Sequence, residues 1–293
     1  MKDLVKGAYD LHIHSAPDIL PRLMDDIEMA QRIIACDMAG YVIKSHYFCT
    51  AERAALINTL FPQCHAVGAI TLNSSVGGIN PAAVEMAARA GAKMVWFPTS
   101  DSRHEQDHVF NGGPGTKMPY WAQIVIQLKE EGISNPVIDI LENGRLIDAV
   151  YEVIDIIAKK DIILATSHIS HKEAFALVKA AHERGVKKII ITHVDFPTTF
   201  YTVDEQLELA KYGAIMEHCY TTWATGKVQL ETALEQIRSL GADRVIISTD
   251  LGQKNALYPD EGLTAYAAKL CEHGFTAADI HKMVADNPAA LIA

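Results

Sequence analysis

The chain has 293 residues, of which 49% are hydrophobic and 21% are charged, a composition typical of globular proteins. The formal net charge of −10 and the lack of a basic cluster argue against nucleic-acid binding, because neutralising phosphates requires a basic surface. The five cysteines are scattered, no apolar leader is visible, and no apolar run approaches the roughly 18 residues of a membrane helix, so we expect a reduced, cytoplasmic protein without a membrane partner.

Short apolar runs rich in β-branched residues alternate with longer amphipathic segments along the chain. This alternation is typical of βα units that build a parallel sheet. The runs expected to be strands are residues 8–14, 41–46, 66–71, 93–97, 162–168, 188–193, 214–218 and 244–250. Eight strands in a chain of this length predict one α/β domain, a (β/α)8 TIM barrel spanning residues 1–293.

Several segments between these runs carry helical periodicity and a glycine stop signal. The ranges expected to be helices are 24–40, 81–91, 171–185, 203–213 and 228–241. Two segments depart from this alternation of expected strands and helices. Residues 98–119 are polar and rich in Gly and Pro, which predicts a long loop of the kind that is often functional. Residues 136–146 predict a small β-hairpin insertion that turns at Asn143 and Gly144.

The first run, in YDLHIHS, ends with His12 and His14. Side chains alternate faces along a strand, so both imidazoles are expected on one face, with Leu11 and Ile13 on the other. Two imidazoles held side by side can bind a metal ion, although an isolated His-x-His pair is a weak signal.

Other runs also end in metal-capable or ionisable groups. The second ends with Lys44 and His46, the fifth with His168, the sixth with His193 and the eighth with Asp250. A parallel barrel gathers the carboxyl ends of its strands at one rim, so these groups are expected to converge. Because an unpaired ammonium buried beneath a helix is costly, Lys44 is expected to point into the barrel. The pattern predicts a site of neutral imidazoles and a carboxylate, with room for water.

Further polar groups near the expected rim are less informative. In the seventh run, Glu217 and His218 alternate, so at most one of them faces the interior. His104 and His108 fall in the long loop and are expected to be solvated. The cations that could meet an anionic substrate are Arg103, Lys117, Arg145 and Lys44.

The ordered set of residues resembles the amidohydrolase superfamily of metal-dependent barrel hydrolases. That family carries HxH on strand one, a histidine on each of strands five and six, and an aspartate on strand eight. The matching positions here are His12, His14, His168, His193 and Asp250. The resemblance runs over the whole chain and implies that these five side chains hold one or two divalent ions, Zn²⁺ first. It also implies that Asp250 is the base that deprotonates the attacking water.

The sequence departs from this family on the fourth strand. Many members with two metal ions carry a carboxylated lysine or a glutamate there, whereas residues 96–98 are Trp, Phe and Pro. Two substitutes are open: Lys44, in a carboxylated form, and Glu142 in the expected hairpin. Otherwise the site holds one ion, and His193 bonds to a ligand instead of to metal.

The resemblance implies hydrolysis of an amide, lactone, ester or related bond of a small organic substrate, with Asp250 and Lys44 as catalytic residues. The stretch DLHIHS also resembles PHP-type phosphoesterases, which is the first alternative. The second is a metal-free binding barrel without turnover. Assembly into a homo-oligomer is left open.

Overall fold

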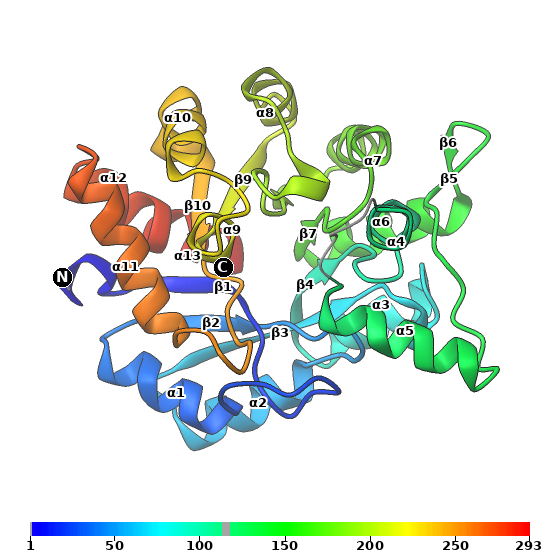
Figure 1. Ribbon diagram of the computed structural model, residues 1–293, viewed down its shortest axis with the longest axis horizontal. Helices are drawn as coiled ribbons and strands as arrows, with labels where there is room; N and C mark the ends of the chain where they lie inside the picture. Colours follow the sequence, from blue (N-terminus) through cyan, green and yellow to red (C-terminus); the bar gives the residue numbers. More distant parts are fainter. Residues whose placement is uncertain (1, 113–117) are drawn as a thin grey trace.

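Eight parallel strands form a nearly closed barrel in the order β1-β2-β3-β4-β7-β8-β9-β10. The computed structural model describes residues 2–112 and 118–293, and helices ring the strands (Figure 1). The strands are β1 (Tyr9–Ile13), β2 (Gly40–Ile43), β3 (His65–Thr71), β4 (Ala92–Trp96), β7 (Ile163–Ala165), β8 (Ile189–Ile191), β9 (Ala214–Cys219) and β10 (Val245–Ser248). The sheet closes where Ile13 pairs in parallel with Leu251. The predicted (β/α)8 barrel is confirmed.

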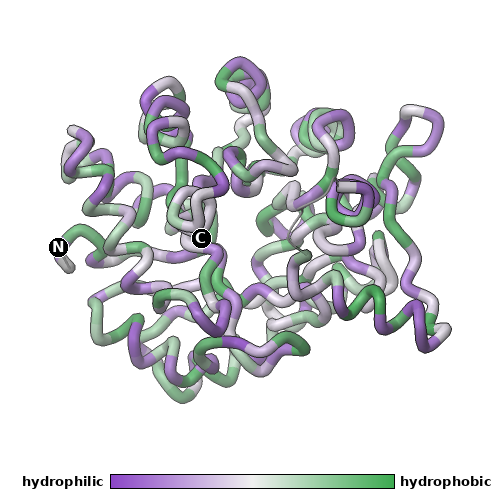
Figure 2. Tube along the Cα trace, in the orientation of Figure 1, coloured by the Kyte–Doolittle hydropathy of each residue, from purple (hydrophilic) through white to green (hydrophobic). Residues whose placement is uncertain are grey.

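Helices follow the strands and cover the outside of the sheet. They are α1 (Asp26–Ala35), α2 (Ala51–Leu60), α3 (Pro81–Arg89), α6 (Asp148–Lys160), α7 (His171–Glu183), α8 (Val203–Ala210), α10 (Leu230–Leu240) and α11 (Pro259–Glu272). The structure contains further helices: α4 (Arg103–Phe110), α5 (Tyr120–Glu130), α9 (Tyr220–Ala224), α12 (Ala277–His281) and α13 (Asn287–Ile292). Hydrophilic and hydrophobic residues mix along each helix, as amphipathic packing requires (Figure 2). Within the described residues, no helix combines the length and the hydropathy needed to cross a membrane.

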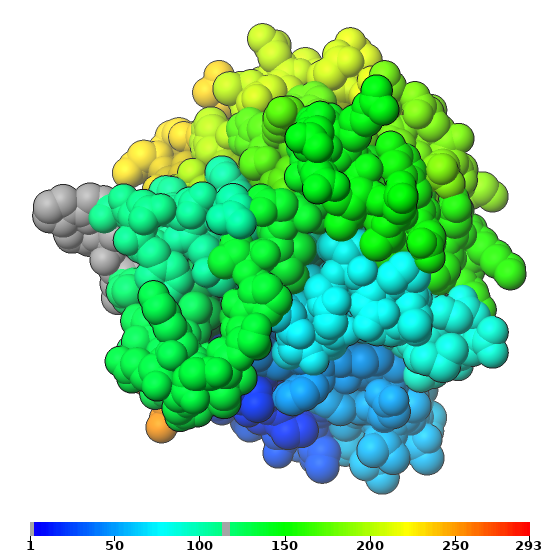
Figure 3. All heavy atoms as spheres, turned by 90° about the vertical axis from the view of Figure 1, so that its right-hand side faces the viewer, coloured from blue at the N-terminus to red at the C-terminus, as the bar shows by residue number. Residues whose placement is uncertain are grey.

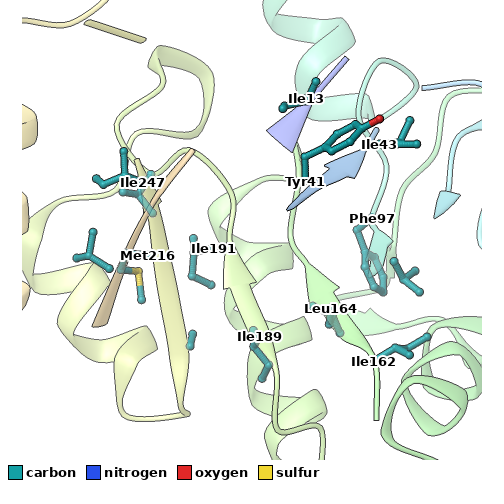
Figure 4. Close-up of a cluster of buried hydrophobic side chains, with 14 of the residues drawn as sticks. Ile13, Tyr41, Ile43, Phe97, Ile162, Leu164, Ile189, Ile191, Met216 and Ile247 are labelled. Carbon is teal, nitrogen blue, oxygen red and sulfur yellow. The ribbon is translucent and has the colours of Figure 1, made fainter. Parts of the chain in front are cut away.

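The core has two layers separated by the sheet. The inner cluster fills the barrel with alternate strand residues and two residues of α13: Leu11, Val42, Val67, Ala69, Met94, Trp96, Ile163, Ala165, Ile190, Ile246, Leu291 and Ile292. The outer cluster lies between the sheet and the helices, and includes Ile43, Leu164, Ile191 and Ile247 (Figure 4). The alternation along the strands decides which side chains face the interior, and the parallel direction of the strands brings their carboxyl ends to one rim.

The first strand departs from simple alternation. Leu11 belongs to the inner cluster, whereas Ile13 belongs to the outer one, so Leu11 does not lie on the far side from the histidines. The pairing register with β2 shifts between Asp10 and Ile13. Such an irregularity re-aims the side chains that follow it, and here it directs His12 inward. The expectation that Leu11 and Ile13 share one face is therefore wrong.

The predicted hairpin insertion is confirmed. Strands β5 (Leu141–Glu142) and β6 (Arg145–Leu146) pair antiparallel. The turn residues Asn143 and Gly144 have φ angles of 50° and 80°, as the tight turn predicted from this dipeptide requires. Figure 3 shows the side of the molecule formed by the green residues of the chain's middle, next to the cyan residues that precede them.

The segment 98–119 is not the continuous loop that its composition predicts, because α4 forms within it. Ser102 caps this helix by accepting a hydrogen bond from the backbone N–H of Glu105. The buried face of α4 consists of Glu105, Gln106 and Val109, so no apolar stripe reveals the helix in the sequence. His104 and His108 lie on this helix. Residues 113–117, including Lys117, lie outside the described part of the chain.

The helix expected over residues 24–40 ends earlier, at Ala35. Gly40 is instead the first residue of β2. A Cβ atom at this position would meet the backbone oxygen of His65 at 2.0 Å, so glycine is required by close strand packing and not by a helix cap. The glycines that end the other four expected helices do adopt positive φ angles.

Candidate metal centre

The candidate residues lie at or just beyond the carboxyl ends of the strands. His12 lies within β1, and the others follow a strand by one to three residues: His14, Lys44, His46, His168, His193 and Asp250. These strands therefore end a few residues earlier than the sequence predicts. Three residues here have positive φ angles: Ser167 (59°), His193 (26°) and Asp250 (54°). Such conformations are uncommon for side-chain-bearing residues and cluster at functional sites.

Asp250 lies at the centre of the first group of ligand atoms. Its Oδ1 atom is 3.2 Å from His12 Nε2 and 3.2 Å from His14 Nε2. Thr221 Oγ1 donates a hydrogen bond of 3.1 Å to the other oxygen, Oδ2. Burial raises the pKa of Asp250, but His12 and its neighbours outweigh this effect and hold the pKa well below its usual value. The carboxylate is therefore ionised, as a metal ligand must be.

Lys44 points into the barrel, as predicted. Its Nζ atom lies 2.9 Å from His12 Nε2 and 4.0 Å from the centre of the Trp96 ring. Burial lowers the pKa of Lys44 to about 8. Trp96 ends β4 and packs inside the barrel, so this strand end offers no ligand, in agreement with its sequence. Glu142 is exposed on the hairpin and is not gathered with the histidines.

His168 and His193 form a second pair of ligand atoms. Their Nε2 atoms are 3.0 Å apart. The ring of His193 stacks against that of His12 at a centroid distance of 6.0 Å, so the pair adjoins the Asp250 group. Among the described residues, two groups of three could hold an ion: His12, His14 and Asp250, and the buried His12, Glu217 and Cys219. Neither group includes His168 or His193. The five predicted ligands thus form two adjacent groups.

Three of the histidines have a side-chain oxygen close to Nδ1. His12 Nδ1 lies 3.2 Å from Glu217 Oε2, and His168 Nδ1 lies 3.1 Å from Glu105 Oε2. Burial raises the pKa of each glutamate, but the neighbouring histidine lowers it by more. The net pKa lies below its usual value, so both carboxylates are ionised. His193 Nδ1 lies 3.1 Å from Thr199 Oγ1, whose own proton points toward the His193 carbonyl. In a neutral ring, these contacts favour the proton on Nδ1 and leave a lone pair on Nε2.

His14 is bonded differently. Its Nδ1 lies 3.3 Å from Nη2 of Arg22. A guanidinium can only donate, so Nδ1 accepts and the ring proton resides on Nε2, facing Asp250. Ligation of a metal through Nε2 would move this proton to Nδ1 and break the bond with Arg22. Burial, and then the charge of Arg22, lower the pKa of His14 well below its usual value, so the ring is neutral.

The geometry fits a bound divalent cation. The Nε2 atoms of His168 and His193 face each other at 3.0 Å, and that of His12 faces an ionised carboxylate oxygen at 3.2 Å. Facing lone pairs repel unless a proton or a cation lies between them. Ligands bound at about 2.0–2.2 Å to one ion lie roughly 3.0–3.5 Å apart. The ammonium of Lys44 supplies the positive charge beside His12 in this structure.

The structure also places the remaining candidates. His46 stacks on His14 at a centroid distance of 4.9 Å and contacts Thr99 through Nδ1 at 2.8 Å. Of the residues in β9, Glu217 faces the site, whereas His218 contacts Asp195 at 3.4 Å and is fully buried. Their alternation is therefore confirmed.

Arg103 and Arg145, two of the cations expected to meet an anionic substrate, are exposed in the structure. His108 is exposed on α4, and Arg145 is exposed on the hairpin. Arg103 is ion-paired with Asp139, and its side chain is 52% exposed.

The sequence did not predict the side chains that contact the Nδ1 atoms of the histidines. Glu217 carried a weak signal, because it alternates with His218 in a strand, but Glu105 is hidden in an unrecognised helix. Arg22 lies in the loop between β1 and α1, where no periodicity indicates its direction.

Comparisons with known proteins agree with this fold. The family model described as a family of unknown function, DUF6282, matches residues 7–217. No curated protein matches the sequence. Among solved structures, an amidohydrolase from Pseudomonas aeruginosa is 9% identical, with a TM-score of 0.61 over 99% of this chain and 97% of the other. The lactonase Lmo2620 from Listeria monocytogenes is 16% identical, with a TM-score of 0.56 over 99% and 96%.

The probable dipeptidase PvdM from Pseudomonas aeruginosa is also similar, at 10% identity and a TM-score of 0.63 over 99% of this chain and 95% of the other. At these identities the likeness is one of fold, and it confirms at that level the resemblance to amidohydrolases. By its sequence, the chain belongs to the DUF6282 family of unknown function.

Proposed function

We propose that this protein is a metal-dependent hydrolase that cleaves an amide, lactone, ester or related bond of a small organic substrate. One observation carries the proposal: Asp250 Oδ1 lies 3.2 Å from two imidazole nitrogens, beside a second pair of imidazoles whose Nε2 atoms are 3.0 Å apart. Imidazole and carboxylate donors favour Zn²⁺ among the divalent ions. His12, His14 and Asp250 would hold one ion, and His168 with His193 would hold a second or complete the first.

When bound, such an ion would supply Lewis acidity and bring the pKa of water close to neutrality. The side chains of the protein would position the water and transfer its proton. The Asp250 side chain is 18% exposed, whereas those of His12 and His14 are at most 3% exposed. The carboxylate is therefore the accessible side of the centre, placed to accept a proton from water and return it to the leaving group. The hydroxyl of Thr221 fixes the orientation of this carboxylate.

Lys44 would act from the buried side of the centre, through its charge. It is 1% exposed, so substrate does not reach it directly, and its charge lies against His12 and Asp250. In this position the ammonium stabilises the ionised carboxylate and opposes the build-up of negative charge during reaction. A carboxylated Lys44 bridging two ions stays an open alternative to this role.

The test measures metal content and hydrolysis together. The purified protein is analysed for bound metals by mass spectrometry, then assayed with a simple lactone, an aryl ester, an N-acyl amino acid, a dipeptide and an aryl phosphate. We expect stoichiometric divalent metal and turnover of a carbon-centred substrate that a chelator abolishes. Turnover confined to the phosphate would favour the PHP-like alternative. Protein that binds no metal would favour a binding barrel and contradict the proposal.

A further inference from the structure

Arg22 brings a second fixed positive charge to the candidate centre. Its side chain is 5% exposed, and Nη2 lies 3.3 Å from His14 Nδ1. Only the imidazole ring of His14 separates the guanidinium from Asp250, since the opposite ring nitrogen contacts that carboxylate at 3.2 Å. The charge of Arg22 also acts on His46, because burial, neighbouring His14 and Lys44, and Arg22 itself lower the pKa of this histidine.

Asp18 holds one edge of the guanidinium. Its Oδ2 atom accepts from Nε of Arg22 at 2.7 Å and lies 2.6 Å from Nη2. The other oxygen, Oδ1, accepts from the backbone N–H of Ile19 at 2.8 Å and from Ser45 Oγ at 3.3 Å. The Asp18 carboxylate is thus itself fixed, and its side chain is fully buried. This arrangement pre-organises the guanidinium and spares a ligand much of the entropy cost of ordering it.

The loop that carries Arg22 is held by its backbone. The N–H of Ala16 donates to the carbonyl of Met24 at 2.9 Å, and the N–H of Leu23 donates to the carbonyl of Gly252 at 2.9 Å. Arg22 itself forms a bridge with Gln253. These bonds close the loop through its backbone, independently of the Arg22 side chain.

One nitrogen of Arg22 remains unused. Within residues 2–112 and 118–293, Nη1 has no hydrogen-bond acceptor, although its neighbours Nε and Nη2 have theirs. If His14 ligates a metal through Nε2, its ring proton moves to Nδ1 and Nη2 also loses its acceptor there. Two adjacent N–H groups would then face one direction, which is the arrangement that pairs with the two oxygens of a carboxylate.

From this geometry we infer that Arg22 binds a carboxylate of the substrate, so the substrate is an anionic acid whose carboxylate lies a few bonds from the scissile group. The inference rests on the proposed hydrolase function and narrows its substrate class to carboxylate-bearing amides, lactones or esters. Asp18 already occupies one edge of the guanidinium, which leaves a single edge for the two oxygens of one carboxylate.

The experiment uses malonate and its neutral diamide as probes of the metal-loaded protein, with acetohydroxamate as a probe of the metal ion alone. Calorimetry compares the wild type with Arg22→Met, Arg22→Lys and a matched control, Arg103→Met, which removes an arginine that is also paired with an aspartate but is 52% exposed. We expect the wild type and the control to prefer malonate over malonamide. Arg22→Met should weaken malonate binding at least about tenfold while leaving acetohydroxamate binding unchanged. The malonate affinity of Arg22→Lys should lie between those of the wild type and Arg22→Met.

Equal malonate affinity in the wild type and Arg22→Met would overturn the inference, and intact acetohydroxamate binding would then leave the hydrolase proposal standing. Wild-type protein that takes up no metal would overturn both. If Arg22→Met fails to load metal, Arg22→Lys decides: a preserved preference for malonate over malonamide at wild-type strength contradicts a role for the guanidinium fork. An Arg22-dependent response to inorganic phosphate but not to malonate would also contradict the carboxylate assignment.

Discussion

Glu217 Oε2 lies 3.2 Å from Nδ1 of His12, and both side chains are buried within the barrel. The contact fixes which ring nitrogen carries the proton and thereby keeps Nε2 available to a metal. Carboxylates in this position typically change metal affinity by about 10–100-fold. We expect Glu217→Gln to weaken metal binding by that factor, because the amide oxygen can accept the same hydrogen bond but carries no charge.

The measurement is competition with a coloured chelator, with Glu142→Gln on the exposed hairpin as the matched control. The idea fails if both variants hold metal as tightly as the wild type.

Removal of a histidine from either group should reveal how the ions are distributed. His12 contacts Asp250, Lys44 and Glu217, so His12→Ala is expected to lose both metal and activity. His168→Ala should also lower metal content and activity, since it removes one of two facing nitrogens. Metal per chain, measured by mass spectrometry, gives the stoichiometry, and His108→Ala on the exposed part of α4 serves as control. Unchanged metal content in either variant would remove that histidine from the ligand set.

Asp250→Asn separates proton transfer from substrate binding. The amide can still receive the hydrogen bond from Thr221, but it is a far weaker base than a carboxylate. We expect kcat to fall by about 10²–10⁴ while KM changes little. Metal content must be measured alongside, because Asp250 is also an expected ligand. Full activity in a metal-loaded Asp250→Asn enzyme would exclude this residue as the base.

Asp10 should give the stability of the protein a distinct dependence on pH. Burial raises the pKa of this carboxyl to about 7, against roughly 3.9 in an unfolded chain. Between these values the folded protein binds more protons than the unfolded one, so the free energy of unfolding should fall as pH rises from about 4 to 7. The full effect is roughly 2–4 kcal/mol.

Asp10→Asn should flatten this dependence, because the amide cannot ionise. Thermal unfolding of chelator-treated protein at several pH values provides the measurement. A curve for the variant that falls as steeply as that of the wild type would assign the effect elsewhere.

Gly252 keeps the loop of Arg22 against the first strand. A Cβ atom there would lie 1.7 Å from the backbone oxygen of His14, and the glycine has a φ angle of 134°. We expect Gly252→Ala to destabilise the protein by roughly 1–3 kcal/mol more than Gly185→Ala, which also places a methyl group on a residue with positive φ (83°) but in open space. Chemical denaturation compares the two. Equal destabilisation would mean that the loop yields to the added methyl group.

The strands were predictable because each is a short apolar run, and the register of a parallel barrel then decides where their ends meet. His12, His14 and Asp250 could be brought together on that basis alone. The strand ends were less predictable, because the backbone turns at Ser167, His193 and Asp250 depend on tertiary contacts. Regular alternation cannot foresee such turns.

Long-range polar contacts account for what the sequence concealed. Glu105 lies on a helix whose buried face is polar, so hydrophobic periodicity gives no sign of it. Arg22 is positioned by backbone bonds between two loops that are far apart in the chain. Even the inward direction of His12, directly after an inward Leu11, results from an irregular pairing of β1 with β2.

The indole of Trp96 lies against both the Lys44 ammonium, at 4.0 Å, and the His12 ring, at 4.7 Å. A cation that displaces the ammonium from His12 must change the electric field across this indole. The only other tryptophans in the sequence are Trp121 and Trp223. If both are replaced by phenylalanine, the tryptophan fluorescence comes from Trp96 alone and reports cation binding at the centre. Occupancy of the centre would then be visible without a substrate.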